Sequence, residues 1–421
     1  MKTCKKSVLA LSIQASLLAA AMGLSPALLA QESDKDQAAE ETKLERIMVT
    51  AQKRVQSTQE VPISIATLSG EKFDALFAGG EDIQALSGKI PGLYAESSNG
   101  RAAPRFYIRG LGNTDFDLAA SQPVSVIMDD VVMENVILKS FPLFDMEAVE
   151  VIRGPQGTLY GRNTIGGAVK YITKPLSGDN ELSLRGTVGN YGQKDFKIAG
   201  QTALTDKLFF GAALATLNRD GFGTYLNTGA ENYDKDIMTG RVSLQYQATD
   251  NLRFSFAADR TEDDSNSKGG HRLTPSLVTG DAPPESVFDS NTSMPADNSV
   301  VTEGQSLTIA WDINSNWTVK SITAKREGVT DTNIDFDSTR LASLDVPAFY
   351  EDEQTSHELQ FLYNSGPLKF ASGLYSFEGD ACGAFGTVLV SGLGVTIENG
   401  GCVQTDSFAG YAQGTYQVND Q

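Results

Sequence analysis

The chain has 421 residues, including 40 glycines and 14 prolines, and carries a formal net charge of −19. Its length allows two or three domains, and the strong negative charge disfavours a nucleic-acid partner. With only two histidines and three cysteines, the sequence shows no Cys/His spacing typical of a metal centre. We therefore expect no metal site and no cofactor.

The first 30 residues read as an export signal. Three lysines (Lys2, Lys5 and Lys6) precede a long apolar stretch that ends in small residues before polar Gln31. This pattern predicts a cleaved secretory signal peptide over residues 1–30. The alternative is a retained membrane anchor, because the apolar stretch is long enough to span a bilayer.

Residues 31–52 form a lead-in to the first domain. The segment begins polar and acidic, without hydrophobic periodicity, and ends in the extended-looking run Leu44–Ala51. We expect an exposed extended segment here. The alternative is the first strand of a folded domain.

Residues 53–176 have the pattern of a compact α/β domain. Short strand patterns at Val61–Thr67, Arg105–Gly112 and Val124–Val131 lead to a glycine-rich run within Val149–Val169. That run contains Gly154, Pro155, Gly157, Gly161, Gly166 and Gly167. A phosphate-binding loop is disfavoured, because Gly-Lys-Ser/Thr is missing and a strand pattern follows instead of a helix start.

Residues 177–421 change to period-two strands of about ten residues. In Met238–Ala248, for example, apolar and polar side chains alternate between the two faces. Tight polar turns alternate with long polar loops, which we place at roughly Arg260–Thr302, Glu327–Gln354 and Asp380–Thr405. This segregation of short and long connections favours a transmembrane barrel over a soluble β-sandwich.

The order of these motifs resembles the TonB-dependent outer-membrane receptors, and most closely their iron-complex (siderophore) branch. The resemblance implies an α+β plug domain followed by an antiparallel transmembrane β-barrel. About ten of the roughly 22 strands of such a barrel are recognisable, so we expect a chain truncated within the barrel. An independent ten-stranded barrel is the alternative.

The resemblance also implies a function. We expect an importer in the outer membrane of a Gram-negative cell, monomeric and surrounded by lipid, and not an enzyme. Its partner would be the energy-transducing protein TonB, and its solute a ferric siderophore. Cobalamin, an oligosaccharide or another bulky solute stays open, as does a passive porin or adhesin.

Site residues follow by position. Ile47, Met48, Val49, Thr50 and Ala51 match the TonB box, a segment that pairs with its partner by strand addition. Arg109, Arg153 and Arg162 are expected to form ion pairs with barrel-wall carboxylates, and Gly110 and the residues of the glycine-rich run to have structural roles. Asn113, Thr114, Asp115, Phe116 and Asp117 form a candidate ligand loop.

Two cysteines remain after the signal, Cys382 and Cys402. Export to an oxidising compartment makes a disulfide between them plausible, and both lie between the same two predicted strands. Two free thiols are the alternative.

Overall fold

A computed structural model describes residues 48–70, 73, 83–97, 103–115, 120, 122–389 and 394–418. The predicted signal peptide, most of the lead-in up to Ile47, and the loop residues Phe116 and Asp117 lie outside these described residues. Residues Ile47–Gln421 form one compact unit. Within it, the described residues up to Thr173 are called the plug. The ten-stranded sheet that comes after the plug in the sequence is called the wall.

The plug is built on a five-stranded mixed sheet with the order β3-β8-β9-β6-β7. Only the β6–β9 pair is parallel. The bounds are β3 (Ser64–Ser69), β6 (Val124–Met128), β7 (Val131–Met133), β8 (Met146–Arg153) and β9 (Gly167–Thr173). The central strands β6, β8 and β9 are largely buried, as their runs of valine, isoleucine and methionine suggest.

Smaller elements surround this sheet. They are β1 (Met48–Val49), β2 (Gln56–Ser57), the 3-10 helices η1 (Ile83–Leu86) and η2 (Ile137–Lys139), β4 (Leu93–Glu96), β5 (Arg105–Ile108) and the one-turn helix α3 (Gly157–Tyr160). One apolar cluster joins Phe73, Leu86 and Phe106 to the sheet residues Val149 and Tyr171. The plug therefore has its own hydrophobic core.

The glycine-rich run connects β8 to β9 through α3. Gly167 has φ +139°, and a Cβ on it would lie 2.1 Å from the Ile152 carbonyl oxygen on the paired strand. Gly154 and Gly161 also have positive φ. Gly157 differs from all three, because its φ is not positive and a Cβ there would meet open space. Glycine is thus required by the backbone at some positions of the run and not at others.

The wall is a ten-stranded antiparallel sheet in sequential order. Its strands are β10 (Glu181–Val188), β11 (Lys194–Thr205), β12 (Leu208–Arg219), β15 (Lys235–Thr249), β16 (Leu252–Asp263), β17 (Asn298–Asp312), β18 (Trp317–Asp335), β19 (Leu344–Ser365), β20 (Leu368–Leu389) and β21 (Val395–Tyr416). A separate small hairpin, β13 (Gly223–Thr224) with β14 (Glu231–Asn232), lies in the connection between β12 and β15. Among the described strands, β10 and β21 each have one neighbour, so the sheet is open.

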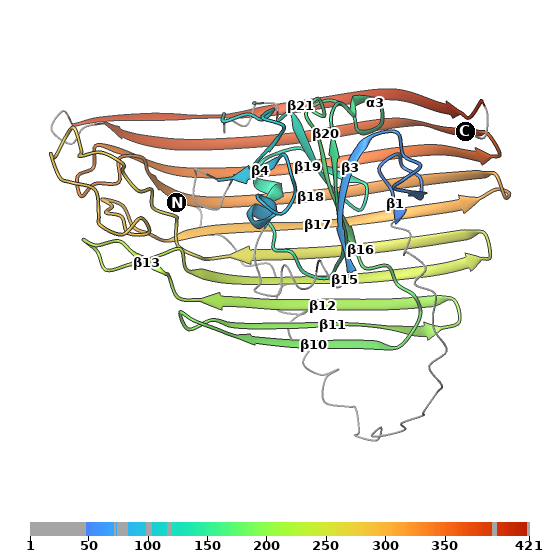
Figure 1. Ribbon diagram of the computed structural model, residues 1–421, viewed down its shortest axis with the longest axis horizontal. Coiled ribbons are helices and arrows are strands. Elements are labelled where there is room, and N and C mark those ends of the chain that lie inside the picture. Colours follow the sequence, from blue (N-terminus) through green and yellow to red (C-terminus); the bar gives the residue numbers. More distant parts are fainter. Residues whose placement is uncertain are drawn as a thin grey trace, which may run out of the picture. The chain divides into compact units, whose positions relative to one another are not determined.

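The tight turns lie at one end of the wall strands, and the two longest connections, 220–234 and 264–297, lie at the other (Figure 1). Figure 1 shows the tight turns at the right-hand end and the long loops at the left-hand end. The long connection between β16 and β17, residues 264–297, agrees with the sequence analysis.

Two predicted loops are wrong. Most of Glu327–Gln354 and of Asp380–Thr405 belongs to β18, β19, β20 and β21, with connections only at 336–343 and 390–394. A strand of 22 residues extends roughly 70 Å, far beyond a hydrocarbon layer of about 30 Å. Strand residues outside that layer need no lipid-facing apolar side chains, so their polar sequence resembled a loop.

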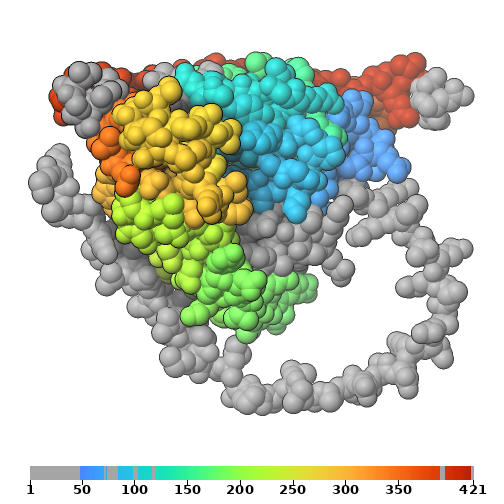
Figure 2. Space-filling view, turned by 60° about the vertical axis from the view of Figure 1, so that its left-hand side comes forward, coloured from blue at the N-terminus to red at the C-terminus, as the bar shows by residue number. Residues whose placement is uncertain are grey.

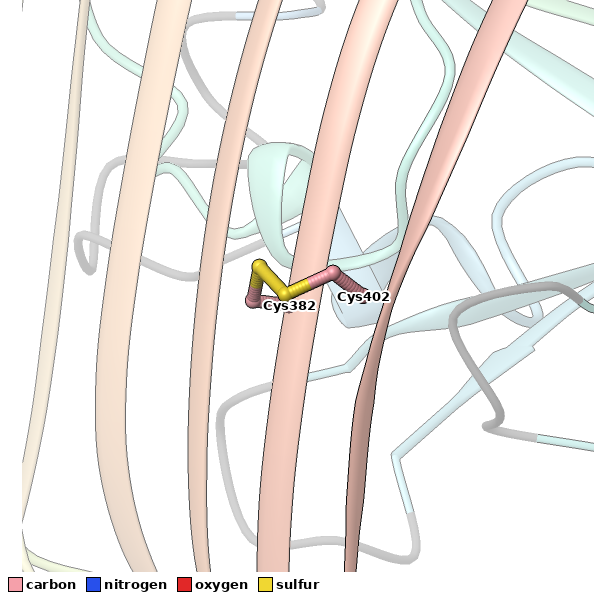
Figure 3. The surroundings of a disulfide bond; sticks show 2 residues. All are labelled: Cys382 and Cys402. Carbon is pink, nitrogen blue, oxygen red and sulfur yellow. A yellow bond between two sulfur atoms is a disulfide. The ribbon is translucent and has the colours of Figure 1, made fainter.

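The structure contains a disulfide between Cys382 and Cys402 (Figure 3). The two residues are directly paired across β20 and β21. The bond thus joins two neighbouring strands in a region, Asp380–Thr405, that the sequence analysis placed in a loop.

No helix within the described part of the chain has the length and apolar character needed to cross a membrane.

Candidate functional site: the contact between plug and wall

A two-residue turn, Asp129-Asp130, joins β6 to β7. Both residues have positive φ, +46° and +70°, and their flanking residues Met128 and Val131 are paired. These are the features of a type I′ hairpin turn, in which the second aspartate stands where glycine is usual. This backbone is unfavourable for most side chains.

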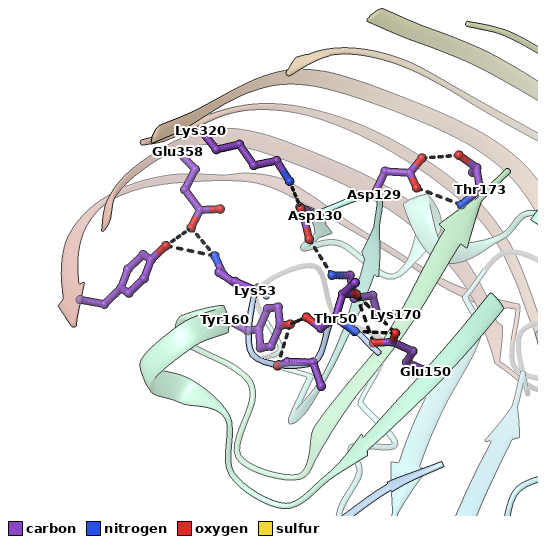
Figure 4. Close-up of polar contacts among 12 residues, drawn as sticks. Thr50, Lys53, Asp129, Asp130, Glu150, Tyr160, Lys170, Thr173, Lys320 and Glu358 are labelled. Carbon is purple, nitrogen blue, oxygen red and sulfur yellow. Dashed lines mark hydrogen bonds and ion pairs between the residues drawn. The ribbon is translucent and has the colours of Figure 1, made fainter. Parts of the chain in front are cut away.

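The Asp130 carboxylate lies between two lysines (Figure 4). Its Oδ1 is 2.7 Å from Nζ of Lys170 on plug strand β9, and its Oδ2 pairs with Nζ of Lys320 on wall strand β18. Burial alone would raise the pKa of Asp130, but the two ammonium groups hold it well below its ordinary value. Asp130 is therefore ionised and bridges the plug and the wall.

Asp129 makes a second bridge. Its Oδ2 is 2.7 Å from an Nη of Arg241 on wall strand β15, and its carboxylate accepts hydrogen bonds from the backbone N–H and hydroxyl of Thr173 at 3.0 and 2.8 Å. One two-residue turn thus connects the central plug strand β9 to two separate wall strands. The two hydrogen bonds from Thr173 fix the direction of the Asp129 carboxylate as well as its distance from β9.

Wall strand β19 presents a buried polar face to the plug. Every second residue from Asp352 to Gln360 is buried, in the set Asp352, Gln354, Ser356, Glu358 and Gln360. The Gln354 amide donates to the Val132 carbonyl at 2.7 Å and accepts from the Glu134 N–H at 3.1 Å. This inward polar face explains why the strand is not uniformly apolar.

Glu358 on this face contacts the start of the plug. It forms an ion pair with Lys53, and both side chains are about 5% exposed. The Tyr411 hydroxyl on β21 donates to Glu358 at 2.6 Å. Burial lowers the pKa of Lys53 by more than Glu358 raises it. The start of the plug is thus connected to the wall two residues after the predicted TonB box.

The predicted TonB box is folded back against the plug. Met48–Val49 pairs with Gln56–Ser57, and Val49 and Ala51 are buried. The Thr50 N–H donates to Glu150 at 2.8 Å, and the Tyr160 hydroxyl donates to the Ala51 carbonyl at 2.9 Å. The expectation of an exposed segment is wrong for Val49 and Ala51, because the plug itself supplies packing and hydrogen-bond partners, while Met48 is 50% exposed.

The three predicted anchoring arginines do not pair with wall carboxylates among the described residues. Arg153 donates to the carbonyls of Pro91 and Ile65, which are plug residues. Arg162 pairs with Glu134 of the plug at 2.9 Å, and its guanidinium lies 5.6 Å from the Phe377 ring of β20. Arg109 is exposed, with φ +52°. We expected cations of the plug to pair with carboxylates of the wall. At Asp129 and Asp130 the charges are reversed, because the plug supplies the carboxylates and the wall supplies the cations.

The described part of the candidate ligand loop is an irregular segment after β5. Asn113 is half-buried, and Thr114 and Asp115 are exposed. Arg105 donates to the Thr114 carbonyl, and the Asn113 side chain accepts from the Asp115 N–H at 3.0 Å. The loop therefore has local support from buried Arg105, and its role in ligand binding stays a prediction.

The sequence analysis missed the residues that form the main contacts, namely Lys53, Asp129, Asp130, Lys170, Arg241, Lys320 and Glu358. One signal was present for Lys170 and Glu150. Each is a charged residue flanked by buried apolar residues within its strand, where an unpaired charge would be costly. Such residues indicate a buried partner, although the sequence does not identify it.

Comparison with known families agrees with this architecture. Residues 57–168 match the family model of the TonB-dependent receptor plug domain. The matched range runs from β2 to the beginning of β9 and so contains the Asp129-Asp130 turn.

Two curated relatives each match part of the chain. The chain is 28% identical over 192 residues to the vitamin B12 transporter of Photobacterium profundum, which corresponds to 44% of this chain and 30% of the transporter. It is 31% identical over 149 residues to an iron-regulated outer membrane virulence protein of Vibrio cholerae, covering 33% and 22% of the two chains. The matched region thus spans less than a third of either relative.

Solved structures extend the likeness to the wall. The ferric yersiniabactin uptake receptor of Yersinia pestis matches with a TM-score of 0.69 at 17% identity, covering 85% of this chain and 62% of the receptor. The ferripyoverdine receptor of Pseudomonas aeruginosa matches with a TM-score of 0.70 at 15% identity, covering 89% and 52%. At these identities the comparisons show a shared fold.

The fold thus consists of a plug domain held against an open β-sheet wall by ion pairs and hydrogen bonds. The chain is related to the TonB-dependent outer-membrane receptors, with a plug domain at residues 57–168. The vitamin B12 relative is a transporter and the two solved structures are receptors, in agreement with the expectation that the chain is not an enzyme.

Proposed function

We propose that the chain forms the plug and part of the wall of a TonB-dependent importer for a ferric siderophore or a similar large solute. The supporting observation is the plug itself, held against the wall by buried ion pairs and hydrogen bonds. A folded domain in this position blocks diffusion, so passage of a large solute requires work on the plug. We further propose a signal peptide at 1–30, a lead-in at 31–52, a plug at 53–176 and a wall at 177–421.

In this proposal Ile47–Ala51 is the segment that TonB binds. Strand addition requires free main-chain N–H and C=O groups. Those of Met48 and Val49 are paired with β2, and the Ala51 carbonyl accepts from Tyr160. Release of this segment from the plug would therefore precede contact with TonB. The protein would act as a monomer in outer-membrane lipid.

The related proteins favour two different solutes. The iron-regulated relative and the solved receptors for ferric yersiniabactin and ferripyoverdine favour a ferric siderophore. The vitamin B12 transporter of Photobacterium profundum favours cobalamin as the second candidate. Neither His271 nor His357 lies in a motif that would hold haem.

Uptake measurements test the proposal. Cells that lack the gene and carry it on a plasmid are given radiolabelled ferric siderophores or cyanocobalamin, with and without TonB. We expect uptake of one of these solutes to need TonB and to be lost on deletion of Ile47–Ala51, while surface binding is retained. Uptake that persists in both the deletion and the TonB-deficient cells would identify a passive porin and refute the importer.

A further inference from the structure

Three aspartates meet at the long-loop end of the wall. Asp335 is the last residue of β18, Asp345 is the second residue of β19, and Asp337 lies in the short connection between them. One carboxylate oxygen from each lies within 4.8 Å of the other two. Two oxygens bound to one Ca²⁺ can be separated by at most about 5 Å, twice the usual Ca–O distance of roughly 2.3–2.6 Å. A single ion can therefore contact all three carboxylates.

Asp345 provides an independent indication of a ligand. The residue is 4% exposed, and its Oδ1 is buried without a hydrogen-bond partner among the described residues. Its Oδ2 accepts from the Ser293 hydroxyl at 2.6 Å. A buried carboxylate oxygen without a partner is costly, and a cation would relieve that cost.

No basic side chain in the described part of the chain forms an ion pair with these three aspartates. Arg340, the basic residue closest to them in sequence, pairs with Asp281 at 3.3 Å. Three carboxylates this close repel one another unless a positive charge lies between them. The donor set is made of oxygen alone, which suits a hard cation such as Ca²⁺ and not zinc or copper.

Backbone groups already orient the carboxylates. Asp335 Oδ1 accepts from the N–H groups of Asp337 and Ser338 at 3.1 and 2.7 Å, and Asp337 Oδ1 accepts from the Thr339 N–H at 2.9 Å. Each carboxylate oxygen has two lone pairs, so these contacts leave capacity for a metal. Water and neutral oxygens would complete the six to eight ligands usual for Ca²⁺.

We propose that Asp335, Asp337 and Asp345 bind one Ca²⁺ ion that fastens the β18–β19 connection to the long loop 264–297. Ser293 belongs to that loop and contacts both strand ends, through its N–H to Asp335 and its hydroxyl to Asp345. The same loop reaches the plug, where Lys268 donates to Gln84 at 3.2 Å. In Figure 2, which brings the long-loop end forward, the yellow and gold loop atoms lie beside blue and cyan plug atoms. The ion stabilises this loop, whatever solute the protein carries.

Calcium titration of the purified full chain tests the site. The protein in detergent is stripped with a chelator and titrated with CaCl₂ by calorimetry, and its melting temperature is followed in parallel. We expect one saturable site with a Kd on the order of 10⁻⁴–10⁻³ M, the range of extracellular calcium modules. MgCl₂ should bind at least about tenfold more weakly, because Mg²⁺ demands a tighter octahedral shell. Absence of saturable Ca²⁺ binding, or equal affinity for Mg²⁺, overturns the proposal.

Matched variants locate the ion. Asp345→Asn and Asp337→Asn should each weaken Ca²⁺ binding at least about tenfold, since each removes a charged ligand. Asp331→Asn, on the exposed side of the same strand β18, is the control and should bind as the wild type does. In chelator, Asp345→Asn should melt at the wild-type temperature or above it, because it removes an unpaired buried charge. Wild-type affinity in both cluster variants would place the ion elsewhere and refute the assignment.

Discussion

Asp130 of the plug and Lys320 of wall strand β18 form a partly buried ion pair, and Asp130 also pairs with Lys170 of the plug sheet. Asp130 stands at a turn position with φ +70°, a conformation that few residues other than glycine, asparagine and aspartate adopt. This turn places its carboxylate between two cations. We regard this pair as the central contact between plug and wall.

Lys320→Gln should loosen the plug from the wall. It leaves the partly buried Asp130 carboxylate with Lys170 as its remaining cation, and loss of a hydrogen bond to a charged group costs about 1.5–3 kcal/mol. We expect a lower melting temperature in detergent and faster proteolysis of the plug. The matched control is Lys325→Gln on the same strand, whose pairs with Glu327 and Glu353 are exposed and worth at most about 1 kcal/mol. Equal effects of the two substitutions would show that Lys320 is not an anchor.

Tyr160→Phe should release the predicted TonB box. The substitution removes the hydroxyl that donates to the Ala51 carbonyl and keeps the buried ring. Loss of this hydrogen bond costs roughly 1 kcal/mol or more, so amide hydrogen exchange at residues 48–57 should become about fivefold faster. Tyr416→Phe, at a tyrosine that is 65% exposed, serves as the control. Unchanged exchange in Tyr160→Phe would mean that the segment is held by its other contacts.

Gly167→Ala should prevent correct folding of the plug. The new Cβ would lie 2.1 Å from the Ile152 carbonyl oxygen, and φ +139° excludes an ordinary L side chain. We expect little folded protein in the outer-membrane fraction. Gly157→Ala, where the Cβ meets open space at the start of α3, should be neutral or slightly stabilising, by about 0.5–1 kcal/mol. If both substitutions acted alike, the steric explanation would be contradicted, because, of the two glycines, only Gly167 lacks room for a Cβ.

Asp145→Asn should change how stability depends on pH. Burial raises the pKa of Asp145 to about 6, above its ordinary value in the unfolded chain. The contribution of a group shifted in this direction is fully present below pH 4 and is lost as the pH rises through 6. The wild type should therefore lose stability relative to the variant between pH 4 and pH 7, by on the order of 2 kcal/mol, with no further change at higher pH.

Asparagine suits this test because Asp145 has φ +53°, a conformation that asparagine also tolerates. The measurement is the melting temperature of both proteins in detergent across that pH range. A constant difference between the two proteins from pH 4 to pH 7 would show that Asp145 does not titrate there.

Much of the fold was predictable because it follows from local patterns. The period-two alternation of strands such as β15, the tight polar turns and the glycine-rich run each depend on residues close together in sequence. They led to ten wall strands and a preceding α+β domain, both of which the structure contains. The lengths of β19 and β20 were not predictable in this way, because polar strand residues beyond the membrane have no lipid-facing pattern.

The sequence by itself determined the order of an α+β domain and a run of alternating strands, since both depend on local periodicity, and its motifs resembled one family of receptors. Only the tertiary structure decided which charges meet. Lys53 and Glu358 are 305 residues apart, and Asp130 and Lys320 are 190 apart. A buried charge demands a partner, but any lysine or arginine can satisfy that demand, so the choice is made by the packing of plug against wall.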